Sequence, residues 1–263
     1  SRRQGRAHEG PALPPGCTVM QGDVADPAAV RRIIAAIDAA LPPLRGVFHL
    51  AGSLSDGAIL RLSGDDLAKV FAAKVDGALN LEAATIGRPL DAFVLFGSSA
   101  GLIGNAGQGA HAAANAVLGA MAHARQARGL PGLCIDWGAW GEAGAVAATP
   151  AGARLTAAGA ALMAPRDALQ ALGRAIASGR ARLLVAAIDW PRFLAGYGAA
   201  VPGFFAAVAP PRAAPPRQAK AGQTTAGADP RASRAALGAF IAAEAARVLR
   251  VGAGEYLAPD LPL

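Results

Sequence analysis

The residues with the clearest chemical potential are Ser98, His111 and Asn115. Ser98 follows the apolar run Phe93–Phe96, which we predict to be a strand, while His111 and Asn115 lie in a predicted helix over residues 108–128. Positions 111 and 115 are one helical turn apart, so both side chains lie on one helix face. A serine that follows a strand can meet residues of the next helix at one point of a cleft. The alternative is that Ser98 caps a turn and that His111 is a satisfied polar residue of an alanine-rich helix.

Lys74 is a further candidate for chemistry. It lies in the middle of a predicted helix beside the apolar residues Val70, Phe71 and Val75. A lone ammonium is out of place there unless a cleft or a partner receives it. The alternative is that the side chain reaches along the apolar surface and keeps its charged end in water.

Residues that suit a nucleotide follow the other predicted strands. They are Asp23, Ala51, Gly52 and Gly138. An aspartate there can accept a hydrogen bond from an adenine amino group, and an Ala-Gly pair lets a ribose or a nicotinamide approach the backbone closely. Taken singly, each of these residues is as readily explained by a turn or a cap.

The elements that must position these residues alternate between short apolar runs and longer alanine-rich stretches, from Cys17 to about Ile188. This alternation predicts an α/β fold, a Rossmann-like parallel sheet with helices on both faces. We predict strands at 17–20, 47–50, 93–96, 133–135 and 183–188. We predict helices that begin after the caps Asp26 and Ser63, the second running to Ala84, and helices over 108–128 and 165–178.

Composition and charge exclude several classes of protein. The chain has 263 residues, of which 53% are hydrophobic, and a formal net charge of +7. The arginines are scattered and form no basic stripe with aromatic residues, so we expect no nucleic-acid partner. No apolar run approaches the roughly 20 residues of a membrane helix, and no secretory signal begins the sequence, so we expect a cytoplasmic protein without membrane contact. Cys17 and Cys134 are expected to be small core residues in a reducing compartment, and no metal site is expected.

The composition changes near the C-terminal end. Residues 1–207 read as one α/β domain, and residues 208–233 are rich in Pro and Ala, which indicates a linker. Residues 234–263 regain a helical pattern over Ala235–Leu249, but one helix of this length cannot build a domain of its own.

Several segments resemble one known family. They are Gly46–Gly52, Lys74–Ala78, Phe93–Gly101, Gly107–Ala116, Asp136–Trp140 and Ile188–Phe193. Together they resemble the ketoreductase domain of a modular type I polyketide synthase, of the short-chain dehydrogenase/reductase superfamily. Residues 234–263 resemble the start of an acyl carrier protein domain, and they end before the serine to which that family attaches phosphopantetheine.

The resemblance implies an activity, a cofactor and partners. The activity is NADPH-dependent reduction of a β-ketoacyl thioester to the β-hydroxyacyl product, with the substrate tethered to an acyl carrier protein and with other domains of the same synthase as partners. By resemblance Lys74 binds the nicotinamide ribose, Ser98 holds the substrate carbonyl and Asn115 orders a relay water. The cofactor-binding residues that it implies are Arg2, Arg3, Asp23, Val24, Ala51, Gly52, Lys74 and Gly138.

The sequence departs from this family at the proton donor. The family has a tyrosine at the position of His111. A histidinium could donate a proton, because its unperturbed pKa of about 6.5 makes it a stronger acid than a tyrosine, with a pKa of about 10. Imidazole is shorter than phenol by roughly an ångström, and a misplacement of that size can cost about 100-fold in rate.

A second departure concerns the phosphate-binding loop. No Gly-x-Gly-x-x-Gly follows any predicted strand, so we expect the first strand, the phosphate loop and the first helix of the fold to be missing. The sheet would then have an uncovered flank, and we expect this chain to bind NADPH weakly or not at all. The rival hypotheses are a catalytically inactive structural domain that keeps the fold, and a domain that binds some other nucleotide.

The resemblance also predicts the stereochemical type. Leu54-Ser55-Asp56 resembles the Leu-Asp-Asp motif of B-type ketoreductases and keeps its last aspartate, Asp56, while Ile103 takes the place of the A-type tryptophan. The resemblance therefore implies a D-configured β-hydroxyacyl product.

Overall fold

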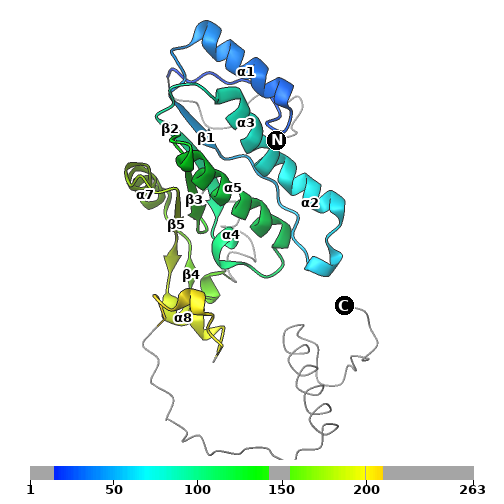
Figure 1. Cartoon of the computed structure of the whole chain (residues 1–263). Helices are drawn as coiled ribbons and strands as arrows, with labels where there is room; N and C mark the ends of the chain where they lie inside the picture. The colour runs from blue at the N-terminus through cyan, green and yellow to red at the C-terminus, as the bar shows by residue number, and fades with distance from the viewer. Residues whose placement is uncertain (1–14, 142–154, 199, 210–263) are drawn as a thin grey trace, which may run out of the picture. The chain divides into compact units, whose positions relative to one another are not determined.

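A four-stranded parallel sheet forms the centre of the protein (Figure 1). The computed structural model describes residues 15–141, 155–198 and 200–209. The strands are β1 (Gly46–His49), β2 (Ala92–Ser98), β3 (Leu133–Trp137) and β5 (Arg182–Val185), in the spatial order β1-β2-β3-β5. The Rossmann-like parallel sheet expected from the sequence is confirmed.

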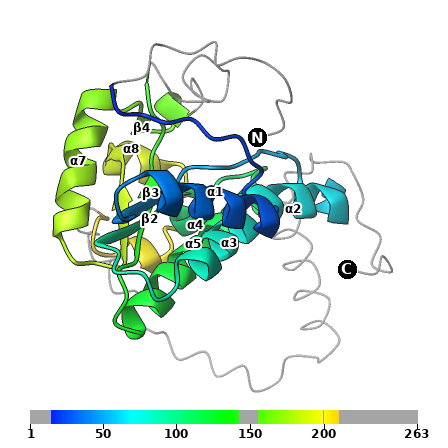
Figure 2. The same ribbon diagram turned by 90° about the horizontal axis from the view of Figure 1, so that it is seen from above.

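The two central strands are buried on both faces, which explains their nearly continuous apolar sequence. Because side chains alternate along a strand, neighbouring residues of β2 enter different cores. Phe93 and Leu95 pack with Leu118 of one helix layer, whereas Val94 packs with Ile135 and the helix on the other side. Figure 2 shows α7 (Pro165–Ala177) on one side of the strands, with α3 (Gly77–Thr85) and α5 (Gly109–Ala127) on the other.

The first helices begin where the sequence predicts. Helix α1 (Pro27–Ala40) starts at Asp26, whose carboxylate accepts a hydrogen bond from the Ala28 backbone N–H at 2.8 Å. Helix α2 (Gly64–Phe71) starts at a capping box, in which Ser63 and Asp66 satisfy each other's backbone N–H groups. The hydrogen bonds from Ser63 and then from Ser55 lower the pKa of Asp66 to about 2.

The helix that we expected to run unbroken to Ala84 has a π-helical segment within it. Helix α2 is followed by Ala72–Asp76 in π-helical geometry and then by α3 (Gly77–Thr85). Such a turn carries one extra residue and changes the direction in which the following side chains point. Lys74 lies at the centre of this segment.

The remaining helices cover the ends and faces of the sheet. They are the short α4 (Ala100–Ile103), the long α5 (Gly109–Ala127) and α8 (Trp190–Ala195), with 3₁₀ turns at Ile59–Arg61 and Gly203–Phe205. Gly129 follows α5 with a φ of 71°, a backbone conformation that favours glycine, so the predicted stop of this helix is confirmed.

Two strand predictions are wrong. Cys17–Met20 has no ladder partner among the described residues, and Cys17 is exposed rather than part of the core, whereas Cys134 is buried. An apolar run becomes a strand only when a neighbour completes its hydrogen bonds. The predicted strand over 183–188 is divided: β5 joins the main sheet, and β6 (Ala187–Ile188) pairs antiparallel with β4 (Ala160–Ala161).

Several expectations concern residues that the structure does not describe. These are the cofactor residues Arg2 and Arg3, most of the predicted linker 208–233 and the carrier-like segment 234–263. Within the described ranges, no helix is long and apolar enough to cross a membrane.

Candidate active site

Lys74 is held inside the protein at the carboxyl end of β2. Its side chain is buried, and its Nζ donates a hydrogen bond to the backbone oxygen of Phe96 at 3.0 Å. Burial lowers the pKa of Lys74, and the charge of Asp136 acts in the opposite direction. Lys74 therefore does not snorkel to the surface, and the alternative reading of this residue is wrong.

Two residues of β1 and its following loop frame Lys74. The Nε2 atom of the buried His49 lies 2.9 Å from the backbone oxygen of Lys74, which fixes the π-helical segment against β1. Gly52 faces the other end of the side chain: a Cβ at this position would lie 3.2 Å from Lys74 Cε and 3.4 Å from Nζ. The absence of a side chain at Gly52 thus leaves the Lys74 ammonium approachable from the loop after β1.

His111 lies in the first turns of α5, within the electrostatic reach of Lys74. Burial lowers the pKa of His111 and the charge of Lys74 lowers it further, while Asp56 opposes both. The Nδ1 atom is buried and has no hydrogen-bond partner within the described residues. At neutral pH the imidazole is therefore mainly neutral.

Asn115 is fully buried one turn further along α5. Its Nδ2 donates to the His111 backbone oxygen at 2.7 Å, and its Oδ1 is buried without a partner in the described part of the chain. A Cβ at Gly101 would lie 2.6 Å from Asn115 Cβ, so α4 packs tightly against this face of α5. A buried amide oxygen without a donor is a site that a water molecule can satisfy.

Ser98 ends β2, two residues after the carbonyl that binds Lys74. Its Oγ accepts a hydrogen bond from the Ala100 backbone N–H at 3.3 Å. Because a hydroxyl has one proton to donate as well as lone pairs, this contact leaves the Ser98 proton free for a substrate oxygen. The same contact is that of a turn cap, which was the alternative for Ser98. Ser98 can cap this turn and still donate a hydrogen bond to a substrate.

The loop that carries Asp56 is fastened to the start of α5. Gln108 Nε2 donates to Asp56 Oδ2 at 3.1 Å, and the Gly57 N–H donates to the Gly107 oxygen at 2.8 Å. Ser55 Oγ donates to Asp66 Oδ1 at 2.7 Å, so the serine of this motif ties the loop to α2. The loop therefore holds Asp56 beside the helix that carries His111.

The residues suggested for the cofactor lie after β1, after β3 and in the loop before α1. Ala51 and Gly52 follow β1 and Gly138 follows β3, both at the carboxyl edge of the sheet where ligands of such folds bind. Asp23 accepts from the Ala25 N–H at 3.0 Å, which is a local turn cap. Val24 accepts from Asn80 Nδ2 at 2.9 Å and so joins its loop to α3.

These contacts fit one end of a nicotinamide nucleotide. At Gly52 the backbone lies next to the Lys74 ammonium, which can donate to the hydroxyl groups of a ribose, and the Lys74 charge acts on His111. For the pyrophosphate, no glycine-rich turn leads from a strand into a helix among the described residues.

The sequence analysis assigned no role to Gln108, His49, Asp136 or Arg182, although the first three lie in segments that resemble the family. Asp136 is fully buried in β3, and Arg182 Nε donates to its Oδ2 at 2.6 Å. The available signal was a charged residue in each of two otherwise apolar strands. Gln108 and His49 act through contacts to distant segments, for which a single sequence offers no signal.

Comparison with known proteins shows similarity to one family. The KR domain family matches residues 12–142. Polyketide synthase GfsB of Streptomyces halstedii is 44% identical over 181 residues, which are 69% of this chain and 3% of that protein. The phthioceranic/hydroxyphthioceranic acid synthase of Mycobacterium tuberculosis (strain ATCC 25618 / H37Rv) is 46% identical over 123 residues, which are 47% of this chain and 6% of that protein.

Solved structures agree with this. The first ketoreductase of the tylosin polyketide synthase superposes with a TM-score of 0.63 at 42% identity, covering 69% of this chain and 39% of that one. An A-type ketoreductase from a modular polyketide synthase gives a TM-score of 0.65 at 36% identity, covering 70% of this chain and 39% of that one. The chain thus spans about two fifths of these structures and a few per cent of the synthases. Residues 12–142 thus match the KR domain family, and the chain is similar to ketoreductases of modular polyketide synthases.

Proposed function

We propose that this chain is part of a type I polyketide synthase that reduces a carrier-bound β-ketoacyl thioester to the β-hydroxyacyl thioester with NADPH. One observation carries the proposal: the buried Lys74 ammonium and the unpartnered ring nitrogen of His111 share the carboxyl end of the sheet. Burying an ammonium without an ion-pair partner of its own is costly, so its presence is best explained by a ligand.

NADPH, when bound, supplies the hydride for the carbonyl carbon. Ala51, Gly52 and Lys74 would hold its nicotinamide ribose, with Gly138, Asp23 and Val24 as further contacts, and Arg2 or Arg3 would meet the 2′-phosphate. The fit at Gly52, where a Cβ would press on Lys74, supports the first part of this assignment.

The side chains divide the remaining work. The Ser98 hydroxyl donates a hydrogen bond to the substrate carbonyl and polarises it, since its Oγ only accepts in the protein's own contact. His111 in its cationic form donates the proton that the new alkoxide needs. Asn115 Oδ1 holds a water that returns a proton toward this site, which accounts for its missing partner.

Asp56 is proposed to set the face from which the ketone is reduced. Its hydrogen bond from Gln108 fixes the loop next to α5, and this arrangement suits the B-type outcome, a D-configured alcohol. Solved relatives include A-type and C2-type ketoreductases at similar TM-scores, 0.65 and 0.63, so overall similarity does not distinguish the types.

The proposal extends to the rest of the assembly. We infer a cytoplasmic synthase in which residues 208–233 link the reductase to a carrier domain that begins near residue 234 and bears phosphopantetheine further on. Other domains of the same synthase would deliver and remove the acyl chain.

A second candidate function is an inactive structural domain. It is favoured by the pKa of His111, because burial and the Lys74 charge both leave little of the cationic form at neutral pH. Under this reading the synthase passes the β-ketone on unreduced.

The test is NADPH consumption and alcohol formation by the complete synthase module that contains this chain, with a β-ketoacyl thioester as substrate. We expect Lys74→Met to lower the rate by at least about 100-fold, because the ribose loses its donor. The matched control is Lys69→Met, an exposed lysine of α2, which should keep the wild-type rate. Equal rates for the two variants, or an unreduced ketone with the unaltered module, would contradict the proposed function.

A further inference from the structure

An ion pair with a fully buried carboxylate lies next to the segment that carries Ser98. Arg182 Nε donates to Asp136 Oδ2 at 2.6 Å, and Arg182 Nη2 donates to the Gly101 backbone oxygen at 3.0 Å. Asp136 is 0% exposed and the Arg182 side chain is 21% exposed. One guanidinium thus joins β5, β3 and α4.

Two glycines leave space for the side chains of Arg182 and Asp136. A Cβ at Gly119 of α5 would lie 2.6 Å from Arg182 Cζ, so the guanidinium lies flat against that helix. A Cβ at Gly97 would lie 2.7 Å from Asp136 Oδ1, so the carboxylate presses on the backbone just before Ser98. Neither glycine has a positive φ, so space rather than backbone freedom explains the absence of a side chain at both positions.

The Ser98 segment is fastened on both sides of the serine. Before it, Gly97 rests on Asp136; after it, the Ser99 N–H donates to the Trp137 oxygen at 2.8 Å and Gly101 accepts from Arg182. Gly101 also packs on Asn115, so a movement of α4 would displace both Ser98 and Asn115.

Asp136 of this pair interacts electrostatically with Lys74. Burial raises the pKa of Asp136, and the hydrogen bond and charge of Arg182 oppose that rise, as does Lys74. Burial also raises the pKa of the neighbouring Cys134 thiol to about 12, so Cys134 is neutral at physiological pH. Asp136 is therefore the group that supplies negative charge toward Lys74 from β3.

We propose that Asp136 and Arg182 are positioning residues of this site: their ion pair clamps the Ser98 segment and α4 to the sheet and to α5. This inference rests on the proposed function for its catalytic consequence, but the clamp itself is a property of the fold. Neither residue touches the reacting atoms in this scheme, and both act through Ser98 and Asn115.

The first readout is hydrogen exchange in the full chain. The N–H groups of Leu102 and Ile103 donate to the Ser99 oxygen, and that of Gly104 donates to the Ala100 oxygen. We expect Arg182→Gln to speed exchange of these three amides by about tenfold relative to the amides of β2, because α4 loses its tie to the sheet. Asp136→Asn should act in the same direction, since a neutral amide holds the guanidinium less firmly.

The matched control is Arg125→Gln, which removes a buried arginine that also pairs with an acid. Arg125 is 3% exposed and binds Glu82 at 3.2 Å, but it lies near the C-terminal end of α5, away from Ser98. This variant should lower the stability of the chain without selectively opening α4. If both variants speed the α4 amides equally, or if Arg182→Gln leaves them at the wild-type rate, the clamp is refuted.

The second readout is steady-state kinetics of the complete module. We expect Arg182→Gln to lower kcat by roughly 10- to 100-fold with a small change in KM for NADPH, since Ser98 is displaced and the ribose contacts are not. Arg182→Lys should recover part of kcat, because an ammonium can bind Asp136 but not Gly101 at the same time. A fall in kcat no larger than that of Arg125→Gln overturns the positioning role. If the unaltered module does not reduce the ketone, the proposed function fails and hydrogen exchange alone decides the clamp.

Discussion

The protonation state that a donor needs and the surroundings of His111 act against each other. As a proton donor it must be cationic, yet burial and the Lys74 charge both lower its pKa, and only Asp56 acts the other way. A lower pKa makes the imidazolium a stronger acid but reduces the fraction of molecules that carry the proton. The site can therefore work with a histidine only where the pH is low enough to populate the cation.

Gly52 offers a test of the cofactor assignment at the scale of one atom. In Gly52→Ala the new Cβ would lie 3.2 Å from Lys74 Cε, so the lysine must move by a few tenths of an ångström. We expect KM for NADPH to rise by about 3- to 10-fold with a smaller change in stability. Titration of the complete module with NADPH measures this.

The control for Gly52→Ala is Gly173→Ala. Gly173 lies in α7, where nothing stands within 4 Å of an added Cβ, and KM should be unchanged there. An unaltered KM in Gly52→Ala would show that the ribose does not use the space beside Lys74.

At the scale of elements, helix starts were predictable and the π-helical segment was not. Asp26 with Pro27, and Ser63 with Asp66, carry local capping chemistry that a sequence displays directly. The extra residue in Ala72–Asp76 is set by tertiary contacts, among them His49 on the Lys74 oxygen. Lys74 could be chosen as a candidate from its apolar neighbours, but its bond to the Phe96 oxygen could not.

Strands show the same division. The buried runs of β2 and β3 were predictable because parallel strands covered on both faces are mostly apolar. Cys17–Met20 has a similar composition but lacks a partner in the described residues. The contact of Asp136 with Arg182 joins residues 46 positions apart, and pairing of β3 with β5 creates it.

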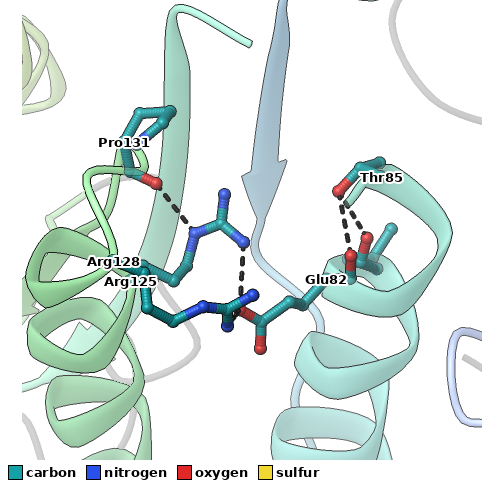
Figure 3. Close-up of polar contacts among 6 residues, drawn as sticks. Glu82, Thr85, Arg125, Arg128 and Pro131 are labelled. Carbon is teal, nitrogen blue, oxygen red and sulfur yellow. Dashed lines mark hydrogen bonds and ion pairs between the residues drawn. The ribbon is translucent and has the colours of Figure 1, made fainter. Parts of the chain in front are cut away.

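An ion-pair network joins Glu82 of α3 to Arg125 and Arg128 at the C-terminal end of α5 (Figure 3). Arg125 Nε donates to the Pro131 oxygen at 2.8 Å, its Nη1 reaches Glu82 at 3.2 Å, and its guanidinium lies 3.8 Å from the centre of the Phe93 ring. We expect Arg125→Gln to lower the free energy of unfolding by about 2 to 3 kcal/mol, because Glu82 and the Pro131 oxygen lose a charged donor. Urea denaturation of the chain measures this change.

The comparison for that prediction is Arg45→Gln. Arg45 pairs with Asp91, but both side chains are more than half exposed, at 57% and 64%. Exposed pairs contribute little, so a change within about 0.5 kcal/mol is expected. If both variants lower the free energy of unfolding equally, burial is not the reason that the Arg125 network stabilises the protein.

At the scale of the whole molecule, the parallel sheet explains why residues far apart in sequence form one site. The carboxyl ends of β1, β2 and β3 lie at one edge of the sheet. Gly52, Ser98 and Gly138, which end or follow these strands, therefore lie at that same edge. Lys74, Ser98, His111 and Asn115 could be chosen from the sequence because residue type and helical spacing are local, and their roles stay predictions. The clamp of Asp136 and Arg182 needed the assembled sheet.

The central claim is that His111 is a working acid in a ketoreductase site. The most direct measurement is single-turnover NADPH consumption by the complete module, with a β-ketoacyl thioester, from pH 5 to 8, with His111→Tyr as the comparison. Because the donor must be cationic and the pKa of His111 lies below its usual 6.5, the wild-type rate should be highest at the acid end. It should fall about tenfold per pH unit above that pKa, while the tyrosine variant, whose phenol has a pKa of about 10, stays level. A wild-type protein that is silent at every pH, with turnover only in His111→Tyr, would contradict the claim and identify a retained structural domain.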